Sequence, residues 1–234
     1  MMHALSSIEV GRDYERYVGH LYEVAGWRVR YRGILQGYRD AGRDLVCSRG
    51  RCVHIVQCKC WSKHSDIGDD VVRKLVETTE VFKSVAQPDG QLCLEMSECA
   101  EMKVFPVLIS NGPLSIEARK LSELSGVKYR ENWRFDRNYP KLKCVAVRDG
   151  RRLYLGPSVY SYDSISVRVH SGDRYVRNEQ EAERLGYELH PDSLVLFSAP
   201  KRCEPLEYTS PTEDEAMEIL RHFFQAWETE EPTD

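Results

Sequence analysis

No stretch of this chain is apolar over the length of a membrane span, and its start lacks the marks of a secretory signal. The 234 residues are 41% hydrophobic and 30% charged, whereas a membrane-spanning helix needs about 20 consecutive apolar residues. The Met-Met-His start has neither a basic region nor a following apolar run. We therefore expect a globular cytoplasmic protein with one sizeable core and a smaller appendage.

An excess of positive charge is also lacking, because the formal net charge is −4. That balance comes from the end of the chain. Residues 204–234 hold ten acidic residues against Arg221 alone, a formal charge of −9. The preceding 203 residues therefore carry +5, which permits binding to a polyanion.

Eight cysteines are present, and a cytoplasmic location predicts that they are reduced thiols. Cys47, Cys52, Cys58 and Cys60 leave a zinc site open as an alternative. Cys58 and Cys60, however, are neighbours on one face of a predicted strand, whereas paired zinc ligands usually come as Cys-x₂₋₄-Cys. A buried face of inert thiols is the favoured interpretation.

Two short segments predict a hairpin that gathers three polar side chains. Residues 43–47 and 53–61 have the alternation and composition of strands, and turn-forming residues join them. Residues two apart on a strand project from the same face, so Gln57 and Lys59 point the same way. The hairpin then places Asp44 beside them.

This set of side chains suits phosphodiester hydrolysis. A divalent cation held by hard oxygen ligands polarises a phosphate and lowers the pKa of a bound water. Asp44 is the predicted anchor, Gln57 offers an amide oxygen, the main chain at Cys58 adds another oxygen, and Lys59 orients water or neutralises developing charge. The alternative is that Asp44 is a turn residue, Gln57 a polar residue of the sheet, and Lys59 a solvated charge at the sheet edge.

A helix is predicted before this hairpin. Its apolar face is formed by Tyr14, Tyr17, Val18, Leu21, Tyr22 and Ala25. Gly26 is its predicted end. Glu15 lies at the edge of the apolar face, where a carboxylate can reach the same site, and the alternative is an ordinary exposed glutamate.

The segment 27–32 alternates strictly and predicts the first strand, with Arg28, Arg30 and Arg32 together on one face. That face is either a phosphate-binding surface or an unpaired solvent face. Lys63, His64 and Arg73 are further predicted DNA contacts, each with a solvated surface position as its alternative.

These residues resemble a known pattern. The chain has Glu15 on a predicted helix, Gly42 with Asp44 at the next strand, and Gln57 with Lys59 on the strand after it. In this order it is similar to the Mrr-like branch of the PD-(D/E)XK, or restriction-endonuclease-like, nuclease superfamily. The resemblance extends from about residue 10 to 132. Gln57 stands where the superfamily name has an acid, as in the Mrr-like branch.

The resemblance implies a metal-dependent DNA endonuclease that hydrolyses phosphodiester bonds in restriction or defence, with Mg²⁺ or Mn²⁺ as cofactor and DNA as partner. Glu15, Asp44, Gln57 and Lys59 would form the catalytic set, and Glu15, Asp44, Gln57 and Cys58 the metal ligands. Cutting both strands requires two sites, so a homodimer is expected.

The implied fold is α/β, with a restriction-endonuclease-like αβββαβαβ core whose central mixed sheet is flanked by helices. The later part of the chain agrees with this order. Helices are predicted over 71–82 and 116–124, the latter capped by Ser115 and ended by Gly126, and strands over 104–109 and 127–129.

Three regions are predicted along the chain: a nuclease domain over 1–135, a small α+β module over 139–191, and an acidic tail over 192–234. The module, with strands at 141–147, 152–154 and 166–169 and a helix stopped by Gly186, resembles an accessory module that follows some Mrr-like nuclease domains. Leu155 stands where related modules have His, so no metal role is expected there. The tail carries an amphipathic helix over 214–227 that is predicted to dock on this chain or a second copy.

Two other classes of function fit the same residues. A catalytically silent DNA-binding or interaction module is one alternative, kept open by Gln57 and the acidic tail. A Holliday-junction-resolvase-like nuclease is the other, within the same fold.

Overall fold

The computed structural model describes residues 6–36, 43–60, 66–85, 102–147 and 149–195. Contacts divide the chain into two compact units. The first unit consists of Met1–Gly19 with Val29–Phe135, and the second unit consists of His20–Arg28 with Asp136–Asp234. Helix α1 (Ser7–Val24) therefore contributes residues to both units.

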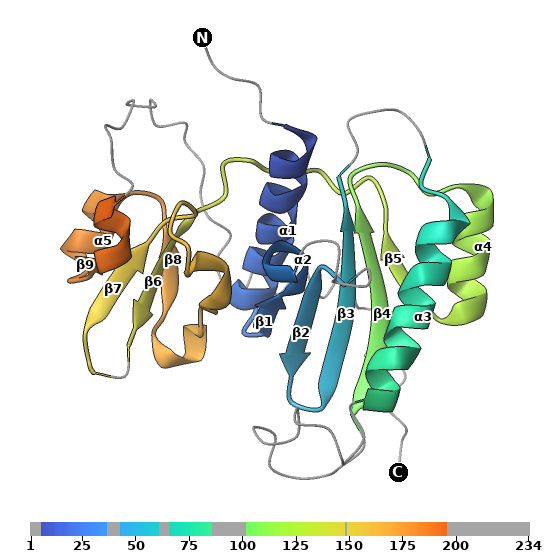
Figure 1. Ribbon diagram of the computed structural model, residues 1–234, viewed down its shortest axis with the longest axis horizontal. Coiled ribbons are helices and arrows are strands. Elements are labelled where there is room, and N and C mark those ends of the chain that lie inside the picture. The colour runs from blue at the N-terminus through green and yellow to red at the C-terminus, as the bar shows by residue number, and fades with distance from the viewer. Residues whose placement is uncertain (1–5, 37–42, 61–65, 86–101, 148, 196–234) are drawn as a thin grey trace. The chain divides into compact units, whose positions relative to one another are not determined.

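The first unit is built on a five-stranded mixed sheet with β3 in the middle (Figure 1). Its order is β1-β2-β3-β4-β5, in which β3 is antiparallel to β2 and parallel to β4, and β4 is parallel to β5. The strands are β1 (Arg28–Tyr31), β2 (Leu45–Arg49), β3 (Cys52–Lys59), β4 (Lys103–Ser110) and β5 (Lys128–Arg130).

The predicted hairpin is confirmed. β2 and β3 pair in register from Leu45 with Val56 to Arg49 with Cys52, and Gly50 turns the chain with a φ of 54°, which a glycine adopts without steric cost. The six residues before Lys59 are all buried. β3 is therefore covered on both faces.

The predicted helices α3 (Asp69–Val85) and α4 (Ile116–Ser125) are also confirmed (Figure 1). Ser115 caps α4 by accepting a hydrogen bond from the N–H of Ala118, and Gly126 ends it in the left-handed conformation. Their buried side chains share one core cluster with those of the sheet. Ile116 and Leu124, at the two ends of the apolar spacing that predicts α4, are 62% and 86% exposed.

The predicted first strand, over 27–32, is one residue too long at each end. β1 ends at Tyr31, and Arg32 opens the short helix α2 (Arg32–Gln36). The N–H groups of Arg32 and Gly33 both donate to the carbonyl oxygen of Asp44, at 2.8 and 3.0 Å. A tertiary hydrogen-bond acceptor thus ends the strand where side-chain alternation alone predicts that it continues.

The second unit contains a four-stranded sheet in the order β8-β6-β7-β9. Its elements are β6 (Leu142–Ala146), β7 (Arg152–Leu155), β8 (Arg174–Val176), α5 (Glu179–Arg184) and β9 (Glu188–Leu189), with 3₁₀ turns η3 (Tyr162–Ser164), η4 (Val169–Ser171) and η5 (Pro191–Val195). Gly186, with a φ of 79°, follows α5 as predicted.

The strand predicted over Ser166–Val169 is wrong. Val167 is buried, but its N–H donates to Oε1 of Glu23 at 3.0 Å and not to a neighbouring strand. Val169 then begins the 3₁₀ turn η4. A side-chain carboxylate has replaced a strand as the hydrogen-bond partner of this segment.

Together these elements confirm the predicted α/β class, a mixed sheet flanked by helices with a further α+β part. Among the described residues, no helix is long and apolar enough to cross a membrane. The helix predicted over 214–227 lies outside the described residues.

Candidate active site

Asp44 immediately precedes β2 and is fixed by hydrogen bonds to β3. Its N–H donates to the carbonyl oxygen of Val56 at 3.0 Å, and its Oδ2 accepts from the N–H of Cys58 at 2.6 Å. The residue is only 6% exposed. A buried carboxylate that accepts a short main-chain hydrogen bond has a defined orientation.

Gln57 and Lys59 lie on the strand next to Asp44. Continuing the β2–β3 register by one pair places Asp44 opposite Gln57, which is 4% exposed. Lys59 is the last residue of β3 and is half-buried. The hairpin therefore brings the three predicted residues together on neighbouring strands.

The end of β3 is itself held by β4. Lys59 pairs with Ser110, and the N–H of Asn111 donates to the carbonyl oxygen of Lys59 at 3.0 Å. The N–H of Trp133 in turn donates to the carbonyl oxygen of Ser110 at 2.8 Å. The main chain that carries Lys59 is thus restrained at the edge where the site lies.

Glu15 reaches the same place from α1. A Cβ atom built on Gly33 would lie 2.8 Å from Oε2 of Glu15 and 3.0 Å from Oδ1 of Asp44. Both carboxylate oxygens thus lie within 3.0 Å of a single point, so their separation is at most the sum of those two distances. Residues 29 positions apart in the sequence are thus brought to the same place in the fold.

The charges of these residues act on one thiol. Burial raises the pKa of Cys58 well above its usual value, and the carboxylates of Asp44 and Glu15 raise that pKa further, whereas Lys59 lowers it. Three of the predicted catalytic residues therefore influence the Cys58 thiol electrostatically. Burial likewise raises the pKa of Tyr14, with Cys58 contributing, so both groups stay neutral.

The chemistry of the donors suits a divalent cation. Oε2 of Glu15 and Oδ1 of Asp44 are hard carboxylate donors that both lie beside Gly33, and proteins usually bind Mg²⁺ through one or two carboxylates. Across the described ranges, no group of three or more His, Cys, Asp or Glu side chains is arranged to hold a metal ion. The candidate site therefore contains two carboxylates, those of Glu15 and Asp44.

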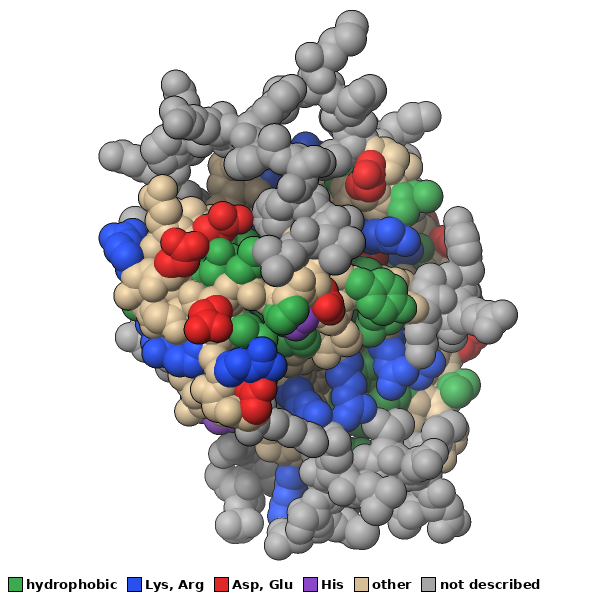
Figure 2. Space-filling view, turned by 60° about the vertical axis from the view of Figure 1, so that its left-hand side comes forward, with side chains coloured by type: hydrophobic (Ala, Val, Ile, Leu, Met, Phe, Trp, Pro, Cys, Tyr) green, Lys and Arg blue, Asp and Glu red, His purple; other side chains and the backbone are tan. Residues whose placement is uncertain are grey.

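The predicted DNA contacts differ in exposure. Arg28 is exposed, and Arg30 and Arg32 are half-buried. Arg73 is exposed and forms an ion pair with Asp69 at 2.7 Å. Lys63 and His64 lie outside the described residues. The face drawn in Figure 2 carries Lys and Arg side chains interspersed with acidic ones.

Gly33 is the residue of this site that the sequence patterns did not single out. The signal that was available is the end of strict alternation at Arg32, after which Gly-Ile-Leu follows. Only the folded chain places that glycine against the two carboxylates.

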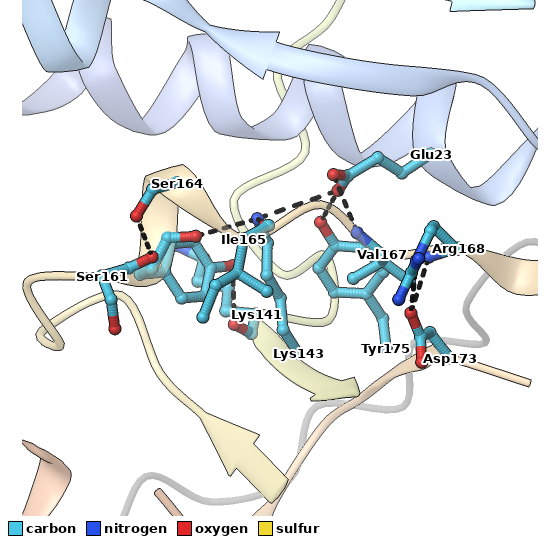
Figure 3. Close-up of polar contacts among 11 residues, drawn as sticks. Glu23, Lys141, Lys143, Ser161, Ser164, Ile165, Val167, Arg168, Asp173 and Tyr175 are labelled. Carbon is cyan, nitrogen blue, oxygen red and sulfur yellow. Dashed lines mark hydrogen bonds and ion pairs between the residues drawn. The ribbon is translucent and has the colours of Figure 1, made fainter. Parts of the chain in front are cut away.

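A second polar cluster lies within the second unit (Figure 3). Glu23 and Lys143 are fully buried, with Nζ and Oε2 3.9 Å apart. The hydroxyl of Tyr175 donates to Glu23, and Nζ of Lys143 donates to the carbonyl oxygens of Tyr162 and Ile165 at 3.1 and 2.5 Å. Each charged group therefore has protein partners in the core of this unit.

Comparison with known proteins agrees with the geometry of the first unit. Residues 7–86 match the family model Mrr_cat, described as a restriction endonuclease. No curated protein and no solved structure shows a significant match. The matched segment includes Glu15, Asp44, Gln57 and Lys59, and the mixed sheet flanked by helices is compatible with a restriction-endonuclease-like fold. Residues 7–86 are therefore similar to a restriction endonuclease domain, which is consistent with an Mrr-like nuclease of the PD-(D/E)XK superfamily.

Proposed function

We propose that this protein is a metal-dependent DNA endonuclease that hydrolyses phosphodiester bonds and works in restriction or defence. The observation that carries the proposal is that Oε2 of Glu15 and Oδ1 of Asp44 both lie beside Gly33, within 3.0 Å of the position of a Cβ atom built on it, and that Gln57 and Lys59 lie on the neighbouring strand. The match of residues 7–86 to a restriction endonuclease family supports the same activity.

In this proposal Glu15 and Asp44 hold a divalent cation, Mg²⁺ or Mn²⁺, and Gln57 and the main chain at Cys58 contribute further oxygens. When bound, that cation supplies polarisation of the scissile phosphate and a lower pKa of bound water. The hydrogen bond from the Cys58 N–H to Oδ2 keeps the Asp44 carboxylate in one orientation, so that Oδ1 is presented to the ion.

Lys59 has a different role. Its ammonium group stabilises negative charge that develops on the phosphate, or orients the attacking water. The position of Lys59 at the end of β3, where Asn111 holds its carbonyl oxygen, supports this role because a charge that stabilises a transition state must be placed in advance.

DNA is the proposed substrate, bound through basic residues that include Arg28, Arg30 and Arg32. Phosphate contacts of this kind make affinity fall as salt concentration rises. A homodimer is the proposed assembly, since cutting both strands of a duplex requires two sites.

A cleavage assay tests the function. Plasmid and branched DNA are incubated with Mg²⁺ or Mn²⁺ and wild type, Asp44→Asn or Lys59→Ala, with Asp69→Asn as the control that removes a carboxylate from the exposed ion pair on α3. We expect the two site variants to bind DNA and fail to cut it, and the control to cut like wild type.

Other outcomes would point elsewhere. Equal cutting by all four proteins refutes the site, and DNA binding without cutting by wild type indicates a silent binding module. Preference for the branched substrate indicates a junction resolvase.

A further inference from the structure

We propose that Gly33, in helix α2, is a positioning residue that keeps open the space in which the carboxylates of Glu15 and Asp44 meet. This inference rests on the proposed function, because it concerns the same pair of acids. It assigns a role to α2, a helix inserted between the first two strands of the sheet.

The first step concerns the main chain. The N–H groups of Arg32 and Gly33 donate to the carbonyl oxygen of Asp44 at 2.8 and 3.0 Å. Asp44 is also bonded to β3 through its own N–H and through Oδ2. Its backbone is thus held from both sides, and α2 cannot move away from the carboxylate without breaking two hydrogen bonds.

The second step concerns space. A Cβ on Gly33 would lie 2.8 Å from Oε2 of Glu15, 3.0 Å from Oδ1 of Asp44 and 3.1 Å from the Asp44 Cα. All three distances are shorter than van der Waals contact, which for carbon atoms begins near 3.5 Å. The contacts with Oδ1 and Cα of Asp44 require shifts of only a few tenths of an ångström. Since the Asp44 backbone is restrained, the group that moves furthest is Oε2, at the end of the flexible Glu15 side chain, where the contact is shortest. A methyl group at position 33 therefore displaces Glu15 from the proposed metal.

The third step concerns the glycine itself. Six other glycines of the described chain have a positive φ, but Gly33 does not. Its backbone conformation is one that any residue adopts, and alanine is the better helix former. Position 33 therefore has to lack a side chain, because the atoms that a Cβ would meet belong to Glu15 and Asp44, the two candidate metal ligands.

The test compares two Gly→Ala substitutions in helices. Gly33→Ala fills the space beside the carboxylates, whereas Gly11→Ala on α1 places its Cβ where nothing lies within 4 Å. Binding of Mn²⁺ is measured by electron paramagnetic resonance, DNA cleavage by plasmid nicking, and folding by circular dichroism. We expect Gly33→Ala to fold and to bind Mn²⁺ about 10- to 100-fold more weakly, the range for residues that orient metal ligands.

The control and a rescue complete the experiment. Gly11→Ala is expected to bind Mn²⁺ and to cut like wild type. In the Gly33→Ala background, Glu15→Asp withdraws the carboxylate by one methylene from the added methyl group, and we expect it to recover part of the Mn²⁺ affinity.

Three results would overturn the inference: unchanged Mn²⁺ binding by Gly33→Ala, an unfolded Gly33→Ala chain, or no recovery with Glu15→Asp. An unfolded chain counts against it because the cost of the methyl group would then fall on the fold and not on Glu15. Failure of the proposed function is seen separately, as cleavage that survives Asp44→Asn in the same assay.

Discussion

Replacing Glu23 by alanine is expected to destabilise the second unit by about 3–5 kcal/mol, the usual size when one partner of a buried ion pair is removed. Glu23 and Lys143 are both fully buried. The substitution leaves the Lys143 ammonium group in the core without its carboxylate, and it removes the acceptor of the Tyr175 hydroxyl and of the Val167 N–H. Each lost acceptor adds a desolvation penalty to the lost charge pair.

The size of the effect depends on what remains around Lys143. Its Nζ still donates to two carbonyl oxygens and lies 4.5 Å from the centre of the Tyr162 ring. Glu23→Gln keeps an oxygen acceptor but no charge, so we expect it to lose less stability than Glu23→Ala. The double variant Glu23→Gln with Lys143→Met removes both charges, so we expect it to be more stable than Glu23→Gln alone or Lys143→Met alone.

Urea unfolding combined with hydrogen exchange of the amides of β6 and β8 measures the stability of the second unit by itself. Glu80→Ala is the control, because its ion pair with Lys83 at 2.8 Å is exposed and is worth about 0.5 kcal/mol or less. If Glu23→Ala costs no more than Glu80→Ala, the pair does not hold this unit together and the argument is refuted.

Three further predictions follow from the same structure. Burial lowers the pKa of His20 and of His54 from 6.5 to about 3. Below pH 6.5 protons therefore bind preferentially to the unfolded chain, and each histidine removes about 1.4 kcal/mol of stability per pH unit down to pH 3. His20→Phe should therefore reduce the fall of the urea midpoint between pH 7 and pH 5. Glu131→Ala removes both carboxylate oxygens that bind Arg119 at 2.9 Å and the acceptor of the Leu114 N–H, and a lower thermal midpoint than that of wild type is expected. Mg²⁺ should raise the thermal midpoint of wild type but not of Asp44→Asn, and equal shifts in both would place the ion elsewhere.

Local patterns predicted most elements of the first unit. The alternation around Gln57 and Lys59 predicted β3, and turn chemistry before it predicted the hairpin with β2, because both depend on residues close in the sequence. Ser115 and Gly126 marked the ends of α4 for the same reason, since a cap bonds to residues within one turn.

The same reasoning failed where a distant partner decided the conformation. Ser166–Val169 alternates like a strand, but the N–H of Val167 bonds to Glu23, which lies 144 positions earlier. Ile116 and Leu124 have helical spacing with the buried Ala118, yet both are exposed. Periodicity shows which residues share a face, but it does not show which faces find a partner.

By itself, the amino-acid sequence determined the type and order of most elements and the residues Glu15, Asp44, Gln57 and Lys59 as candidates, because periodicity, caps and short motifs are local properties of a chain. Only the tertiary structure decided that Arg32 turns from strand to helix, and that Glu15 and Asp44 meet beside Gly33. Those features depend on hydrogen bonds and excluded volume between segments far apart in the sequence, and no local pattern encodes them.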